Sequence, residues 1–264
     1  MKRSYQIWLL ALIITLASAV YQRLTGPTHP THYVTLLNAK AISVTLDRAH
    51  GGDDNHVVAV TTNDDAITGA VEWNRYKTND EYTVVPMTYA NGILSAELPH
   101  QPPAGKLYYK VILTDGKETF NASTVIRFRG DVPATVLILH VIFMFGGMLL
   151  ATRTGLEVFL KEPKLRMLTD MTLVFITIGG MMLGPLVQQY AFNEWWTGIP
   201  FGHDLTDNKT LIAFIAWIIA AVADRKSKNP KRWILGAAVV TLLVFLIPHS
   251  AWGSELDYNA LDAQ

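Results

Sequence analysis

Residues 136–150 read VLILHVIFMFGGMLL, and this stretch decides the class of the protein. It is apolar throughout, except for His140 and the glycine pair Gly146-Gly147. With its flanks it approaches about 20 residues, the length that an α-helix needs to cross the hydrocarbon core of a bilayer. We therefore predict a transmembrane helix over residues 133–152.

Three more apolar stretches follow, and they predict further transmembrane helices. These expected spans are residues 169–190, 209–224 and 232–249. Between the first two spans, Glu157 and Lys161 are four residues apart, which suits a helix that either continues past the membrane or lies along its surface, and that ends at Pro163. Residues 133–250 are thus expected to form a four-helix transmembrane bundle.

The first 21 residues have the layout of a secretory signal. Lys2 and Arg3 precede an apolar run that ends in small residues at Ala17-Ser18-Ala19. Such a segment is either cleaved after Ala19 or kept as an anchor, because about 16 apolar residues are close to the minimum for a span. We favour a retained signal-anchor over residues 1–21. In both cases the segment that follows is exported.

Residues 22–132 carry 10 basic and 12 acidic side chains and are rich in turn signals. Seven or eight short β-branched or alternating runs are separated by turns such as Asn91-Gly92 and Asp115-Gly116. Short strands with a turn every 8–12 residues are typical of an antiparallel β-sandwich. The expected fold class is a mixed membrane protein with an N-terminal anchor helix, an all-β sandwich outside the cytoplasm and the C-terminal bundle.

One part of this region resembles a known class of module. Residues 98–111 read LPHQPPAGKLYYKV, and Asp115-Gly116 follows as a hairpin turn. This order resembles the penultimate-strand region of immunoglobulin-like and fibronectin type III modules, over roughly residues 30–130. The resemblance implies a module that binds, spaces or stiffens, and it does not assign an activity. The chain has no cysteine, so the core has to rest on Trp73, Tyr108 or Tyr109 and aliphatic side chains.

The charges predict an orientation in the membrane. The two links at residues 153–168 and 225–232 are rich in lysine and arginine, whereas residues 191–208 contain neither. The positive-inside rule then places the N-terminus inside, and the sandwich and the acidic tail, residues 251–264, outside. On this topology the inner side has 11 bases and 4 acids, and the outer side has 11 bases and 18 acids. The expected location is the inner, cytoplasmic membrane of a cell.

Several classes of function are disfavoured by what the sequence lacks. The net charge is zero, which argues against nucleic-acid binding. There is no phosphate-binding loop, nucleophile elbow, zinc-protease motif or dinucleotide fingerprint. No charged residue is expected at mid-membrane, which argues against an ion-coupled transporter. We assign no catalytic residue, and we do not expect an enzyme acting on its own.

His140 is the most informative single residue, because it is expected about 10 Å into the membrane. Ionisable groups at such depth usually face the bundle interior and carry function. Without cysteine, histidine can still ligate haem iron. His140, with His249 or His203 opposite, would then contact haem b or a quinone. The alternative is a neutral structural histidine bonded to a neighbouring backbone.

The loop over residues 193–210 is the densest polar cluster. We predict a partner-binding surface at Trp195, Trp196, His203 and Asp204. The alternative is structural: tryptophans at the membrane interface, and Thr206 or Asp207 as the N-cap of the next helix. The set of His203, Asp204 and Asp207 is too generic to predict a metal site. Haem iron is therefore the only metal that we consider.

Two functions follow as expectations. The first is a non-enzymatic membrane subunit that docks a membrane or periplasmic protein through its outward-facing sandwich. The second is a b-type haem or quinone-interacting anchor of an electron-transfer complex. In both cases the lipid bilayer is one partner.

Overall fold

The computed structural model describes residues 2–248, 253 and 255–263. The chain forms two compact units that alternate along it. The helical unit comprises Met1–Pro27 and Val132–Ser254, and the sheet unit comprises Thr28–Asp131 and Glu255–Gln264. The chain therefore passes three times from one unit to the other.

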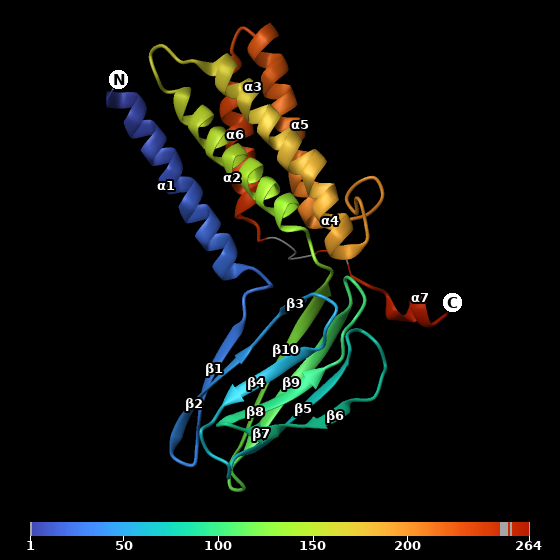
Figure 1. Cartoon of the computed structure of the whole chain (residues 1–264). Coiled ribbons are helices and arrows are strands. Elements are labelled where there is room, and N and C mark those ends of the chain that lie inside the picture. Colours follow the sequence, from blue (N-terminus) through green and yellow to red (C-terminus); the bar gives the residue numbers. More distant parts are fainter. Residues whose placement is uncertain (1, 249–252, 254, 264) are drawn as a thin grey trace. The chain divides into compact units, whose positions relative to one another are not determined.

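The helical unit consists of long helices packed side by side (Figure 1). Their bounds are α1 Lys2–Thr25, α2 Ala134–Glu157, α3 Leu165–Ile176, η1 Thr177–Leu183, α4 Gly184–Phe192, α5 Leu205–Lys226 and α6 Pro230–Leu246. The segment η1 is a π-helix that joins α3 to α4 without a break. It ends two residues before Pro185, whose ring and missing N–H disturb the preceding helical turn.

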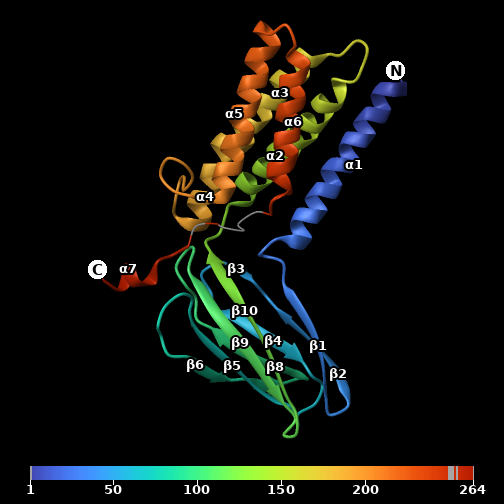
Figure 2. The ribbon, with the colours of Figure 1, turned by 180° about the vertical axis from the view of Figure 1, so that it is seen from behind.

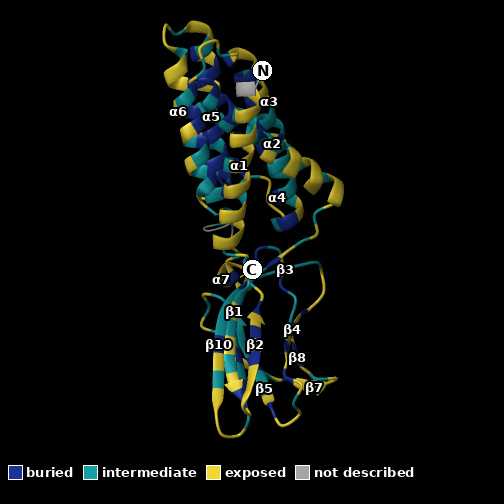
Figure 3. Cartoon of the chain, turned by 90° about the vertical axis from the view of Figure 1, so that its left-hand side faces the viewer, coloured by how far each residue is buried: buried dark blue, intermediate teal, exposed yellow. Residues whose placement is uncertain are grey.

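Within the described residues, four helices are long and apolar enough to cross a membrane. They are Ser4–Thr25, Ala134–Glu157, Leu165–Phe192 and Leu205–Lys226. Their outer surfaces are apolar as well, as in α1, where Leu9, Ile13 and Leu16 are exposed (Figure 3). The segment predicted as the last span, residues 232–249, is different: α6 has 17 residues and is not among these four.

Helix α2 is the central element of the helical unit, because α1, α3 and α6 all pack against it. Close packing on α6 depends on Gly155, where an added Cβ would lie 2.6 Å from the Cβ of Ala238. Helix α2 continues past the predicted span end at residue 152, but it ends at Glu157 and does not reach Pro163. The Glu157 carboxylate pairs with Arg153 on the preceding turn, not with Lys161, and it also accepts the backbone N–H of Lys164.

The sheet unit is sandwich-like, with its strands between residues 31 and 129 (Figure 2). The strands are β1 Thr31–Leu37, β2 Lys40–Leu46, β3 Ala49–Gly51, β4 His56–Thr61, β5 Thr68–Arg75, β6 Thr83–Pro86, β7 Thr88–Ala90, β8 Ile93–Leu98, β9 Lys106–Thr114 and β10 Thr119–Arg129. One sheet has the order β3-β10-β9-β5-β6, a second has β4-β8-β7, and β1 pairs with β2.

Alternation along the strands builds the core between these sheets. In β9 every second side chain is buried, from Leu107 through Tyr109 to Leu113. These residues pack with the inward side chains of β2, β4 and β8 in one hydrophobic cluster. Buried Tyr109 keeps its hydroxyl satisfied by donating to the backbone oxygen of Asp47 at 2.9 Å. The predicted Asn91-Gly92 turn joins β7 to β8, with both residues at positive φ.

The sheet unit also includes the tail, residues 255–262, which ends in the short helix α7, Tyr258–Asp262. Tyr258 is the only buried residue between 255 and 263. The chain therefore returns to the sheet unit after α6.

Candidate functional site

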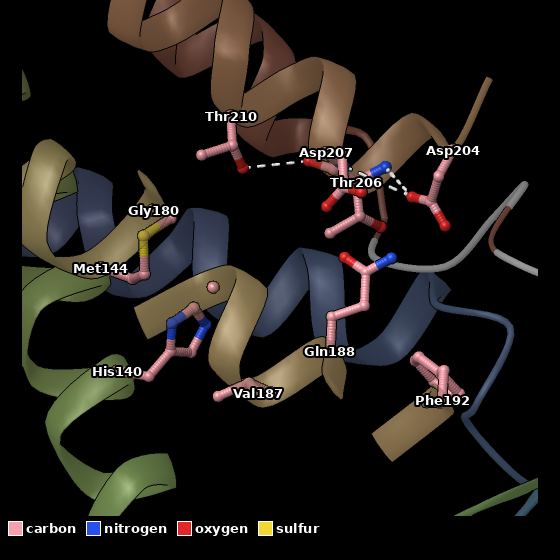
Figure 4. A pocket seen from close by; sticks show the side chains of 11 residues that line it. His140, Met144, Gly180, Val187, Gln188, Phe192, Asp204, Thr206, Asp207 and Thr210 are labelled. Atoms are coloured by element: carbon pink, nitrogen blue, oxygen red, sulfur yellow. Dashed lines mark hydrogen bonds between the residues drawn. The ribbon is translucent and has the colours of Figure 1, made fainter. Parts of the chain in front are cut away.

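A cavity of about 180 Å³ lies inside the helical unit, between α2, η1, α4 and the start of α5. Its lining residues are His140, Met144, Gly180, Gly184, Val187, Gln188, Phe192, Asp204, Thr206, Asp207 and Thr210. Figure 4 shows His140 on one side of this space and the first turn of α5 on the other. The cavity thus combines an apolar wall with polar groups from two helices.

His140 has a defined tautomer in this site. Its Nδ1 lies 2.9 Å from the backbone oxygen of Gly179. Because a carbonyl oxygen can only accept, Nδ1 carries the proton and donates it. The other ring nitrogen, Nε2, makes no hydrogen bond within the described part of the chain, and in the neutral ring it is an acceptor. His140 therefore offers one acceptor to a ligand in the cavity.

Two carboxylates stand on the opposite side, at the start of α5. Asp204 is the N-cap of this helix and accepts the backbone N–H of Thr206 at 2.7 Å. The prediction that Thr206 or Asp207 caps this helix is wrong, because the helix begins at Leu205, before either of them. Asp207 is buried and accepts the backbone N–H groups of Thr197 and Gly198 at 2.7 and 3.1 Å. It thereby fixes the preceding loop to α5.

Two glycines, Gly180 in η1 and Gly184 at the start of α4, shape the cavity in different ways. An added Cβ on Gly180 would lie 2.4 Å from Cγ2 of Thr210, so this glycine lets η1 approach α5. An added Cβ on Gly184 would have its nearest neighbours 3.7 Å and more away, among them Cε1 of His140 at 3.9 Å. Gly180 is needed for packing, whereas Gly184 leaves space that a side chain could occupy.

Hydrogen bonds within the loop and to the first turn of α5 fix the conformation of the loop that precedes this helix. The Trp196 indole N–H donates to the backbone oxygen of Ile199 at 3.1 Å, and Asn208 accepts the N–H of Ile199 at 2.8 Å. Trp195 is 59% exposed, and His203 is also exposed. Of the four predicted partner-binding residues, Trp195 and His203 face outward, Trp196 holds the loop, and Asp204 caps α5.

Of the three histidines predicted to bind a cofactor, the structure describes two, His140 and His203. His140 lines the cavity, and His203 is absent from the lining. His249 lies outside the described residues. No group of three or more His, Cys, Asp or Glu side chains in the described part of the chain is placed to hold a metal ion.

Lys209 is a polar residue whose role the sequence did not reveal. It is 1% exposed, and its Nζ donates to the backbone oxygen of Ile247 at 2.7 Å, at the end of α6. Gln22 of α1 donates to the backbone oxygen of Phe245 at 2.8 Å. Carbonyls at a helix end have no partner within the helix, so these two side chains satisfy that end of α6. A lone lysine near a predicted span end was the only signal.

A second buried polar cluster lies where α2 ends. Arg153 and Glu157 are each 3% exposed and form an ion pair. The guanidinium of Arg153 also lies 5.2 Å from the ring centre of Trp8, on α1. Nearby in the fold, Arg225 of α5 pairs with Asp170 of α3 at 2.7 Å, and both of these side chains are partly exposed. This cluster joins helices to one another.

A comparison of the sequence with protein-family models and with curated proteins found no match.

Proposed function

We propose that this chain is an integral membrane protein whose helices bind the headgroup of a lipid-soluble molecule carrying hydroxyl donors, of the quinol class. The observation that carries the proposal is that His140 of α2 lines one cavity together with Asp204 and Asp207, at the start of α5. A 1,4-hydroquinone has a hydroxyl donor at each end of one ring. Acceptors on two sides of an apolar space suit that shape.

The size of the cavity supports a single ring. A cavity of about 150 Å³ accommodates benzene in a protein interior, and this one measures about 180 Å³. Sites for larger ligands are about 300 Å³ or more. Haem fits less well, because the described lining residues include only one histidine and the space is small for a macrocycle. We therefore favour the quinone-type reading of the predicted cofactor site over the haem reading.

Binding of a matched pair of ligands tests this function. The purified chain in detergent is titrated anaerobically with a short-tailed 1,4-hydroquinone and with its dimethyl ether, which lacks both donors. Two hydrogen bonds at about 1 kcal/mol each correspond to a loss of tenfold or more for the ether. His140→Ala should weaken hydroquinone binding by about tenfold. Ile142→Ala, on the same helix but 54% exposed, is the control.

Two results would overturn the proposal. One is an ether that binds as tightly as the hydroquinone. The other is an affinity that His140→Ala leaves unchanged. Either result means that the cavity does not recognise hydroxyl donors.

For the membrane arrangement we propose an N-terminus inside, the sheet unit and tail outside, and the inner membrane as the location. The split of charges between the links supports this orientation. The tail adds an independent argument. Residues 132–254 start from the sheet unit, and the tail that follows them belongs to that unit again. The segment must therefore cross the membrane an even number of times.

This parity assigns a span to α6. Helices α2, α3 to α4, and α5 are long and apolar enough for three crossings, so in this proposal α6 makes the fourth. Its 17 residues lie at the lower limit of about 17–25 for a span. The chain has no cysteine, so single cysteines at Lys117, Lys228 and Asn259 can be labelled with a membrane-impermeant maleimide. The cysteines at positions 117 and 259 should react from the same side of the membrane, and the cysteine at position 228 from the other side. Labelling of positions 228 and 259 from one side would exclude the fourth crossing.

As a second function we propose that the chain is a membrane subunit that docks a protein partner through its sheet unit. The observation that favours it is that this unit already binds a separate chain segment, the tail, through specific side-chain contacts. The resemblance to immunoglobulin-like and fibronectin type III modules supports the same role. Purification from the native membrane in mild detergent tests it. A monodisperse chain with no co-purifying protein would count against it.

A further inference from the structure

The surface that binds the tail has the features of a peptide-recognition site. We call it the tail site and define it by Arg75, Tyr76, Lys77, Gln101, Gly105 and Lys106. Arg75 ends β5, Lys106 begins β9, and the two strands are neighbours in one sheet. The site is thus built on strand ends of the larger sheet, which hold its side chains in fixed positions.

An aromatic residue occupies the centre of the tail site. Tyr258 is 3% exposed, and its hydroxyl donates toward Oε1 of Gln101 at 3.0 Å and the backbone oxygen of Lys106 at 3.2 Å. An added Cβ on Gly105 would lie 2.8 Å from that hydroxyl, so the glycine makes room for it. The guanidinium of Arg75 lies 5.1 Å from the Tyr258 ring centre. These contacts select an aromatic residue with a hydroxyl group.

Carboxylates flank the aromatic residue on both sides. Arg75 donates to both carboxylate oxygens of Asp262, at 2.9 and 2.6 Å. Lys77 and Lys106 bind Glu255 at 3.0 and 3.3 Å. Arg127 stands opposite Lys106 in the sheet register and adds a fourth base to the neighbourhood. The tail site therefore matches an acidic segment with one central tyrosine.

The contacts of the tail are those of an exchangeable ligand. Apart from Tyr258 and half-buried Leu256, the residues between 255 and 263 are exposed. Exposed ion pairs contribute little each and are screened by salt. A cavity of about 380 Å³ remains between the tail and Tyr76 and Lys77. Segments with few buried contacts open locally far more often than the whole domain unfolds.

We propose that the tail site recognises an acidic, tyrosine-containing segment of a partner protein, and that the tail is its resident competitor. The inference rests on the docking function and adds the partner's chemistry and a means of regulation. A partner segment of matching charge, on the same side of the membrane, displaces the tail. The tail, being part of the same chain, has a high effective concentration and sets a threshold that the partner has to exceed.

A peptide-binding experiment tests this proposal. The probe is a fluorescent peptide with the sequence of residues 254–264, SELDYNALDAQ, and the acceptors are the full chain in detergent and a variant that ends at residue 254. The shortened chain should bind the peptide at least tenfold more tightly than the full chain. Replacing the peptide's tyrosine with alanine should weaken binding at least tenfold, and Arg75→Ala in the shortened chain should do the same.

Controls keep the result interpretable. A scrambled peptide of the same composition separates recognition from net charge. If the shortened chain does not fold, the full-length Tyr258→Ala variant replaces it as acceptor. Equal binding of the scrambled peptide, or no binding by either acceptor, overturns the tail site. A concentration-dependent dimer of the full chain that disappears with Tyr258→Ala also overturns it, because the tail would then serve a second copy. Absence of a co-purifying protein, by contrast, affects only the docking function.

Discussion

Two clusters of polar side chains are buried in the helical unit, one near the start of α2 and one where α2 ends. Where α2 ends, Arg153 and Glu157 pair with each other, and the second carboxylate oxygen is taken by the N–H of Lys164. Where α2 begins, His140 and Asp207 line a cavity, and His140 keeps a free acceptor. Arg153 is thus held by a partner on its own helix and also contacts Trp8 of α1. Polar groups that share an open space are available to a ligand.

The largest expected effect is on stability, when the Arg153–Glu157 pair is broken. Glu157→Ala leaves the buried Arg153 without its partner, which costs about 3–5 kcal/mol in the free energy of unfolding. We expect a large fall in the thermal midpoint in detergent. Asp170→Ala breaks the partly exposed pair with Arg225 and should cost less than about 1 kcal/mol. Equal losses from the two variants would contradict the distinction between the clusters.

The next prediction compares two glycines that line the cavity, one needed for helix packing and one that leaves space for a ligand. Gly180→Ala places a Cβ against Thr210 and should destabilise the chain by about 1–3 kcal/mol. Gly184→Ala has room for its Cβ and removes a flexible residue from a helix, so stability should stay level or rise by up to about 1 kcal/mol. Hydroquinone affinity should nevertheless fall severalfold in Gly184→Ala. Unfolding and binding are measured for both variants. A reversed order of stabilities would contradict the assignment of Gly180 to packing and of Gly184 to ligand space.

The smallest effect concerns the tail, whose acidic groups lie at the surface. The Arg75 hydrogen bond lowers the pKa of Asp262, and burial, which would raise the pKa of Glu255, is outweighed by Lys77 and Lys106, so that this pKa is lowered too. Lowered pKa values mean that the contacts are complete above about pH 4 and are lost as pH falls below it. Asp80, Arg75, Lys77 and Lys106 are the other charged groups that face these carboxylates.

Hydrogen exchange at the backbone of residues 255–262 measures this release. Protection, corrected for the intrinsic rate at each pH, should fall as the pH is lowered below about 4 while β9 stays protected. Tyr258 is not a candidate for the change, since burial raises its pKa to about 12. Protection of the tail that is independent of pH would mean that Tyr258 alone holds it.

Periodicity and turn chemistry predicted much of this fold. Alternation gave the strands of residues 31–129, and the apolar run around His140 gave α2. The β1–β2 turn was not signalled, because Ala39 adopts a positive φ of 59° that alanine rarely takes. The partner of Glu157 was mistaken for Lys161, since i+4 and i−4 spacing are equivalent until the end of the helix is known. The cavity itself was not predicted; His140 was singled out as a candidate ligand, but pairs such as His140 and Asp207 depend on how distant helices pack.

The tail contact has a consequence for the order in which the protein is made. Residues 255–262 are synthesised only after α6, yet their tyrosine completes the surface of a domain whose strands were finished more than a hundred residues earlier. On the topology proposed above, a chain whose α6 does not insert keeps its tail on the other side of the membrane, and the site on β5 and β9 stays uncovered. A docked tail would then distinguish a molecule with its last helix in the membrane from one without.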